Sequence, residues 1–168
     1  MNKLLRILKH RWLDGRDSAR TISAEGLRRL EARVQHSEKA HSGEIRLCIE
    51  AGLPTSYLWQ DLGARERAIT MFGKLRVWDT EANNGVLIYL LLAEHAIEIV
   101  ADRGLARHVP PEFWQGIVAG MREAFRAGRF EDGLNAAIGA VDAILVRHYP
   151  LAPGQSNPNE LPDGPYLG

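Results

Sequence analysis

The longest uninterrupted apolar run of the chain lies near its middle. Residues 86–92 are all apolar or aromatic, and a run of this length is typical of a strand buried on both faces of a sheet. A short polar turn around Glu94 and His95 follows, after which residues 96–102 alternate between apolar and other side chains. The two segments predict an antiparallel hairpin whose first strand lies in the middle of a sheet.

A strand and a helix are predicted before this hairpin. Residues 44–50 place an aliphatic residue at every second position, which indicates a strand with two unlike faces. Residues 61–74 contain a helix with one apolar side. Strand, helix and strand form a crossover unit, so the strands at 44–50 and 86–92 are expected to run parallel in one sheet.

Further helices are predicted on both sides of the hairpin. Ser23 is the expected N-cap of a helix that runs to about His41. Two prolines open a helix that ends at Gly128, and residues 130–148 form a last one. We therefore predict an α/β fold, a three-layer α/β/α sandwich. It holds a short mixed sheet with a parallel βαβ unit and an antiparallel hairpin, and it ends in two C-terminal helices.

The pattern divides the chain into three parts. Residues 1–20 form a basic amphipathic segment, residues 21–150 form the domain, and residues 151–168 form a proline-rich tail. With Pro150, that tail holds five of the eight prolines and has no apolar period, which predicts a flexible or loosely draped segment.

The N-terminal segment leaves two interpretations open. Leu5, Leu8 and Trp12 share one side of a helix, and basic residues stand between them. The helix either packs on the domain or lies at the surface, where it contacts anionic lipid or a partner protein. In the second case the contact residues are Lys3, Arg6, Lys9, Arg11 and Trp12.

Composition narrows the possible partners. Lys and Arg number 21, as do Asp and Glu, so no overall charge favours nucleic acid. Cys48 is the single cysteine, which excludes an internal disulfide and a cysteine-based zinc cluster. The apolar run at 86–93 is far shorter than the roughly 20 residues that span a bilayer.

No catalytic signature is complete. The sequence contains no G-x-S-x-G elbow, no H-E-x-x-H helix and no phosphate-binding loop. No organic cofactor is therefore expected, and the substrate class stays open. Whether the protein is an enzyme also stays open.

The loop before the central strand carries oxygen ligands at alternate positions, as Ca²⁺ or Mg²⁺ requires. A solvated turn, whose side chains cap their own backbone, is the other interpretation. The strands at 44–50 and 96–102 each have an end at the same rim of the sheet, where they add further polar residues. The predicted metal ligands are Asp79, Glu81, Asn84 and Asp102, and the other rim residues are Glu44, Asn83 and Arg103.

Several stretches together resemble the TPM domain family over residues 21–150. They are T-I-S-A-E, G-E-I-R, N-N-G-V-L-I-Y-L-L-L, I-E-I-V-A-D-R-G and F-R-A-G-R-F-E-D-G-L. The resemblance implies an α/β/α sandwich. It also implies a link to membrane-associated repair or stress assemblies and to acid phosphatase activity, since a thylakoid-lumen member has both. Where the family motif reads D-N-G, this chain has Asn83-Asn84-Gly85, so one expected carboxylate is an amide.

Many bacterial relatives carry a signal sequence and a membrane anchor, and this sequence shows neither. We therefore expect a cytoplasmic protein, peripheral at the inner membrane. The first hypothesis is an accessory or binding domain of a membrane-associated assembly. The alternative is a divalent-metal-dependent phosphatase acting on phosphate esters.

Overall fold

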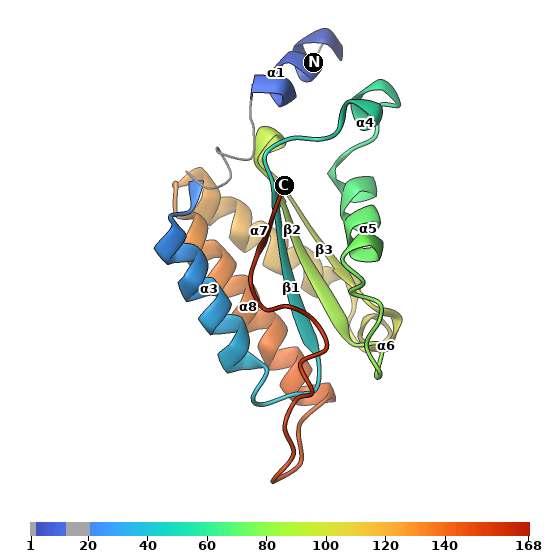
Figure 1. Cartoon of the computed structure of the whole chain (residues 1–168), viewed down its shortest axis with the longest axis vertical. Coiled ribbons are helices and arrows are strands. Elements are labelled where there is room, and N and C mark those ends of the chain that lie inside the picture. The colour runs from blue at the N-terminus through green and yellow to red at the C-terminus, as the bar shows by residue number, and fades with distance from the viewer. Residues whose placement is uncertain (1–2, 13–20) are drawn as a thin grey trace.

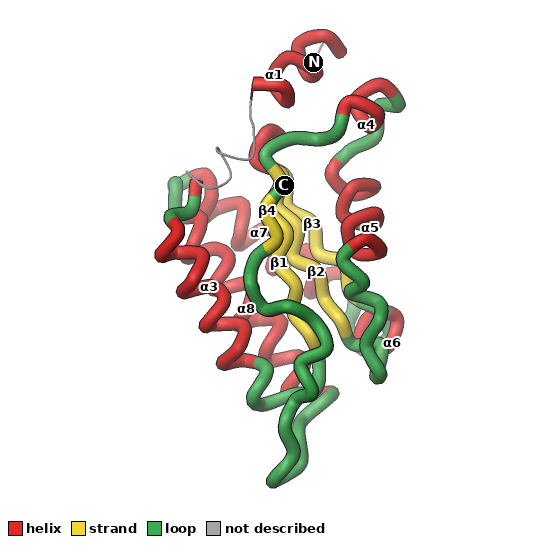
Figure 2. Tube along the Cα trace, viewed as in Figure 1, coloured by secondary structure: helices red, strands yellow, loops and turns green. Residues whose placement is uncertain are grey.

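The computed structural model describes residues 3–12 and 21–168, and these form a three-layer α/β/α sandwich (Figure 1). The strands of the described part are β1 (Glu44–Glu50), β2 (Gly85–Leu91), β3 (Ala96–Ala101) and β4 (Tyr166–Leu167). They lie in the order β3-β2-β1-β4 (Figure 2). β1 is parallel to β2 and to β4, whereas β2 and β3 are antiparallel. The predicted mixed sheet, with its parallel crossover and its hairpin, is confirmed.

Helices cover both faces of this sheet. One face packs on α3 (Ala24–Ser37), α7 (Pro111–Arg126) and α8 (Phe130–His148), and the other packs on α5 (Ala64–Lys74) and the C-terminal segment (Figure 1). The shorter elements are α1 (Lys3–Trp12), α4 (Thr55–Trp59), α6 (Arg103–Ala106) and the 3-10 turn η1 (Leu92–Glu94). No helix in the described ranges is both long enough and apolar enough to cross a bilayer.

The helix that Ser23 caps ends earlier than the sequence indicates. The Ser23 hydroxyl accepts a hydrogen bond from the Gly26 N–H, as predicted, but the helix stops at Ser37 rather than near His41. His41 instead forms an isolated antiparallel bridge with Pro150. This bridge ties the start of β1 to the end of α8.

β2 separates two apolar cores. All seven of its residues are buried, and alternate side chains enter opposite cores. β1 alternates in the same way, with Leu47 in the core under α3, α7 and α8 and Cys48 in the core under α5. On the α5 side, the Arg67 guanidinium and the Tyr89 hydroxyl both donate to the Glu50 carboxylate. A buried carboxylate is therefore neutralised and hydrogen-bonded where a strand face meets a helix.

The C-terminal segment corrects the prediction of a flexible, loosely draped tail at 151–168. Tyr166 and Leu167 form β4 beside β1, and Leu161 is buried in the α5-side core. Arg46 donates to the carbonyl oxygens of Pro162 and Gly164. This packing uses backbone groups rather than an apolar stripe, so hydrophobic periodicity gives no sign of it.

Two glycines allow backbone segments to touch at the loop before β2. A Cβ on Gly85 would lie 2.0 Å from the Val77 carbonyl oxygen, and a Cβ on Gly104 would lie 2.4 Å from the Asn83 carbonyl oxygen. The loop at 79–84 is thus pressed onto the turn that follows β3. Only glycine permits so close an approach of backbone to backbone.

Gly104→Ala is expected to lower the free energy of unfolding by about 2 kcal/mol or more, because the new methyl group meets carbonyl oxygens that are held in place. Gly120→Ala, in the exposed part of α7 with open space around it, is the matched control and should raise stability by about 0.5–1 kcal/mol. Urea unfolding measures both. Equal effects at the two positions would contradict the predicted backbone contact.

Candidate functional site

The polar residues predicted at the sheet rim come from three adjacent strands. Glu44 begins β1 and pairs with Gly85, which begins β2. Asp102 follows β3, and its N–H donates to the Gly85 carbonyl at 2.9 Å. The amino ends of two parallel strands and the carboxyl end of the antiparallel one therefore meet at one end of the sheet, with Asn84 between them.

Asn84 and Asp102 are the rim residues with unused bonding capacity. The Asn84 side chain is fully buried; its Nδ2 donates to the Ser42 hydroxyl at 3.3 Å, while its Oδ1 has no hydrogen-bond partner. Asp102 caps α6 through Oδ1, which accepts from the Arg103 N–H at 2.6 Å, and its Oδ2 is buried without a partner. A buried polar atom that lacks a partner costs free energy, so two such oxygens at one rim mark a place where a donor or a cation would be stabilised.

The other predicted ligands do not turn toward these two oxygens. Asp79 is paired with Arg76 on the exposed side of the loop. Glu81 is exposed, and its N–H donates to the Glu160 carboxylate at 3.0 Å. Asn83 is exposed in the left-handed region with φ of 51°. Arg103 is exposed as well.

Among the residues that the structure describes, no three His, Cys, Asp or Glu side chains are grouped as metal ligands. The oxygens available for a cation are those of Asn84 and Asp102, and these fit Ca²⁺ or Mg²⁺ by chemical type.

Glu44 is engaged by the C-terminal segment. Its carboxylate accepts the N–H groups of Glu160 at 3.1 Å and Leu161 at 3.2 Å. Burial raises the pKa of Glu44 to about 7, although these two hydrogen bonds act in the opposite direction. Glu44 thus anchors the tail to the start of β1.

A second buried carboxyl group lies beside it. Glu38, at the C-cap of α3, accepts a hydrogen bond from the Ile45 N–H at 3.0 Å. Burial, aided by the negative charges of Glu44 and Asp163, raises the pKa of Glu38 to about 8. At neutral pH this side chain therefore tends to hold its proton, and it lines a surface hollow with Asp163.

The helix α1 is fixed to the domain by polar contacts. Arg6 Nε donates to Glu94 Oε1 at 2.7 Å, and another guanidinium nitrogen donates to the Leu62 carbonyl at 2.8 Å. His10 Nδ1 accepts from the Leu53 N–H at 2.9 Å, and its Nε2 lies 3.0 Å from Glu94 Oε1. Since Nδ1 is an acceptor, the ring is neutral with its proton on Nε2, and burial lowers the pKa of His10.

The opposite side of α1 is apolar and faces outward. The exposed fractions of Leu4, Leu5 and Leu8 are 67%, 60% and 52%. Lys9 is exposed, whereas Arg6 is occupied by Glu94. For the other predicted contact residues, Lys3, Arg11 and Trp12, the structure describes the backbone in α1 but not the side chains.

Sequence reasoning missed Glu38, His10 and Glu94. For Glu38 a signal was present, because it lies four residues after the buried Val34 and so falls on the inward side of its helix. The pairing of His10 with Glu94 joins residues 84 positions apart and leaves no local pattern.

The raised pKa of Glu38 predicts a stability that falls as pH rises. The folded state binds the Glu38 proton more tightly than the unfolded state, so this contribution is complete below pH about 4.5 and is lost as pH rises through about 8. Glu38→Gln keeps an acceptor for the Ile45 N–H without the charge. We expect the variant to match the wild type near pH 5 and to exceed it at pH 8 by about 2 kcal/mol or more in urea unfolding.

Glu112→Gln, at an exposed position in α7, is the control and should show no such pH-dependent gain. Burial lowers the pKa values of His10 and His41, so both residues destabilise the fold on acidification. They do so equally in the wild type and in Glu38→Gln, so their effect cancels when the two stabilities are subtracted. A gain that is the same at pH 5 and pH 8 would disprove the assignment to Glu38 ionisation.

Comparison with known proteins agrees with the fold. The solution structure of the BA42 protein from the psychrophilic bacterium Bizionia argentinensis is 26% identical, with a TM-score of 0.76 over 88% of this chain and 95% of that one. The N-terminal domain of a protein from P. gingivalis is 20% identical, with a TM-score of 0.61 over 79% of this chain and 88% of that one, and shows the fold alone. No curated protein matches the sequence. A family model described as the TPM domain matches residues 16–144, and the chain therefore belongs to the TPM domain family.

Proposed function

We propose that this protein is an accessory or binding domain that attaches peripherally to an anionic membrane surface through α1, on the cytoplasmic side of the inner membrane. The observation that carries the proposal is the outward side of α1, where Leu4, Leu5 and Leu8 are all more than half exposed. Large apolar side chains gathered on one exposed helix face are a feature of interfacial helices.

The polar contacts of α1 support this orientation. Arg6 and His10 bind Glu94 on the inner side, so the helix can remain docked while its leucines face outward. The exposed Lys9 stands beside the leucines, where anionic headgroups would be attracted. If the leucines of α1 packed against the domain instead, the helix would have no apolar side left to contact lipid.

Vesicle flotation tests the proposal. The wild type is expected to float with phosphatidylcholine vesicles that contain phosphatidylglycerol and to bind far less to phosphatidylcholine alone. The double variant Leu5→Gln/Leu8→Gln should weaken binding at least about tenfold, because each leucine contributes on the order of 1 kcal/mol when it enters the interface.

Ile69→Gln removes another exposed aliphatic side chain, 53% exposed on α5, and is the matched control. It should leave flotation unchanged. If the wild type fails to float with anionic vesicles, or if the control variant loses as much binding as the double variant, attachment through α1 is wrong.

A second candidate function is metal-dependent phosphatase activity at the sheet rim. It is supported by the two unpartnered buried oxygens, Asn84 Oδ1 and Asp102 Oδ2, and by the family. These residues would hold a divalent cation, which when bound supplies positive charge to a phosphate ester. Against an effective catalytic site stands the amide at Asn83, where the family motif has a carboxylate, since an amide adds no charge to the ligand set.

Asn83→Asp is therefore expected to tighten Ca²⁺ or Mg²⁺ binding by at least about tenfold, because it adds a negative charge to the loop. Asn159→Asp is the matched control, since Asn159 is also exposed with a positive φ, of 52°. Amide chemical shifts followed during cation titration should move at residues 80–85 and 102–104.

Hydrolysis of p-nitrophenyl phosphate with each cation, from acid to neutral pH, measures the activity itself. If cations shift the rim amides of the wild type but no turnover is detected, the protein has a metal site and the phosphatase function is refuted. Absence of shifts in both the wild type and Asn83→Asp would refute the metal site.

A further inference from the structure

The outer edge of β3 has backbone groups without a strand partner. β3 is the last strand of the sheet on its side, since the order is β3-β2-β1-β4. The Asp102 N–H donates to Gly85 on β2, and alternate residues of an antiparallel pair point the same way. Ile97, Ile99 and Ala101 therefore direct their N–H and C=O groups away from β2.

In the described part of the chain, one side chain contacts these outward groups. Arg65 of α5 donates to the Ile99 carbonyl at 2.8 Å, and it also lies 3.4 Å from the Glu98 carboxylate. Its side chain is 51% exposed. A long, half-exposed side chain can move aside at small cost, and until then it protects the edge from non-specific pairing.

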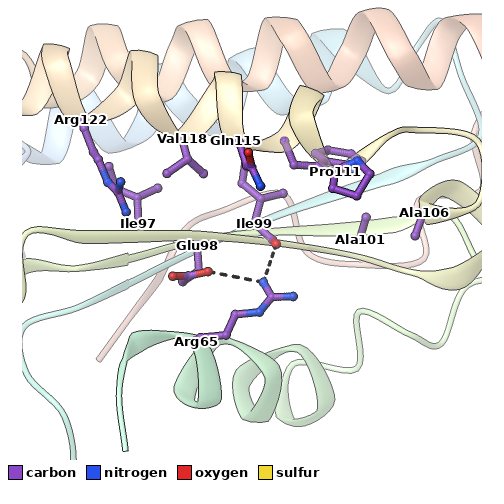
Figure 3. A pocket seen from close by; sticks show the side chains of 11 residues that line it. Arg65, Ile97, Glu98, Ile99, Ala101, Ala106, Pro111, Gln115, Val118 and Arg122 are labelled. Carbon is purple, nitrogen blue, oxygen red and sulfur yellow. Dashed lines mark hydrogen bonds and ion pairs between the residues drawn. The ribbon is translucent and has the colours of Figure 1, made fainter.

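A groove runs along this edge between α7 and α5. Figure 3 shows α7 on one side of the strand and Arg65 on the other, with Gln115, Val118 and Arg122 reaching down from α7. The hollow has a volume of about 450 Å³. A second hollow of about 600 Å³ continues past Arg122 to Phe125 and Arg126. The groove thus extends from one end of β3 to the other.

The shape of this groove suits an extended chain. A strand added beside β3 would pair with the outward groups and would place alternate side chains toward α7 and toward α5. The α7 side offers Trp114 and Val118, which pack partly buried on the core. Apolar side chains at every second position of the added strand would therefore be buried there.

The charge of the groove favours an acidic occupant. The Arg122 guanidinium has no hydrogen bond or ion pair to any described residue, and it lines both hollows. Arg65 stands at the opposite wall, and the acidic side chain nearest to it is Glu98. Two copies of this chain paired edge to edge would bring these arginines together, and like charges placed opposite each other are destabilising.

We propose that this groove binds an extended acidic segment of a partner protein, which adds as a strand to the outer edge of β3. The segment pairs with the backbone of Ile97, Ile99 and Ala101, its α5-side carboxylates face Arg65, and the positive charge of Arg122 at the α7 wall adds to the attraction. This surface is separate from the leucines of α1, so peptide binding and vesicle binding can each fail alone.

Amide hydrogen exchange of the full chain tests the proposal, with a capped six-residue peptide that alternates valine and glutamate as the probe. Without peptide, the outward amides of Ile97, Ile99 and Ala101 should exchange fast, whereas those of Glu98 and Val100 are held by β2. Saturating peptide should slow the outward amides at least about tenfold and leave the inward pair unchanged. Arg65→Glu should weaken binding about tenfold, and Arg122→Glu should weaken it less, because its charge acts from the opposite wall of the groove.

The controls separate this proposal from its alternatives. Arg28→Glu, an exposed charge reversal on α3, should bind the peptide like the wild type, and the peptide with lysine in place of glutamate should not bind. Three results would overturn the proposal. The first is that the outward amides gain no protection up to the solubility limit of the peptide, and the second is that the lysine peptide binds equally well. The third is that protection of the outward amides rises with protein concentration while the mass doubles, which would indicate self-pairing.

Discussion

The burial of β2 on both faces is the constraint on which the rest of the structure depends. Each of its residues is buried, so the sheet needs an apolar cover on both sides. The α3, α7 and α8 layer provides one, while α5 and the C-terminal segment provide the other. With both faces closed, polar groups can reach solvent only at the ends of the strands and at the two outer edges. The rim at Asn84 and Asp102 lies at one such end, and the groove beside β3 lies at one such edge.

Hydrophobic periodicity predicted the parts of the fold that depend on side-chain burial. The alternation of β1, the continuous apolar run of β2 and the stripes of α7 and α8 each mark a surface that must be covered, and each matches the structure. The C-terminal segment is held in another way, by Glu44 and Arg46 binding its backbone. Any sequence that can present free N–H and C=O groups would satisfy these contacts, so composition misled the prediction there.

The candidate rim could be located from the sequence, whereas its ligand set could not. Strand directions alone place Glu44, Asn84 and Asp102 at one end of the sheet, because a parallel pair and a hairpin share that end. Whether a loop side chain turns inward depends on how the loop backbone packs. Here the carbonyls of Ala82 and Asn83 rest on Gly104, and the side chains of Asp79 and Glu81 are left in solvent. The closely packed backbone thus occupies the space that inward-facing ligand side chains would need.

Glu94 links the two surfaces proposed for binding. It accepts from Arg6 and faces His10 on α1, and it also lines the end of the groove beside β3. With α1 docked, Arg6 compensates the charge of Glu94. Glu94 then offsets less of the positive charge of Arg122 and Arg126 at that end of the groove. With α1 detached, an uncompensated carboxylate would stand where an acidic segment has to lie. The outward leucines allow α1 to meet a membrane without leaving Glu94, so the docked helix is compatible with both surfaces being occupied at once.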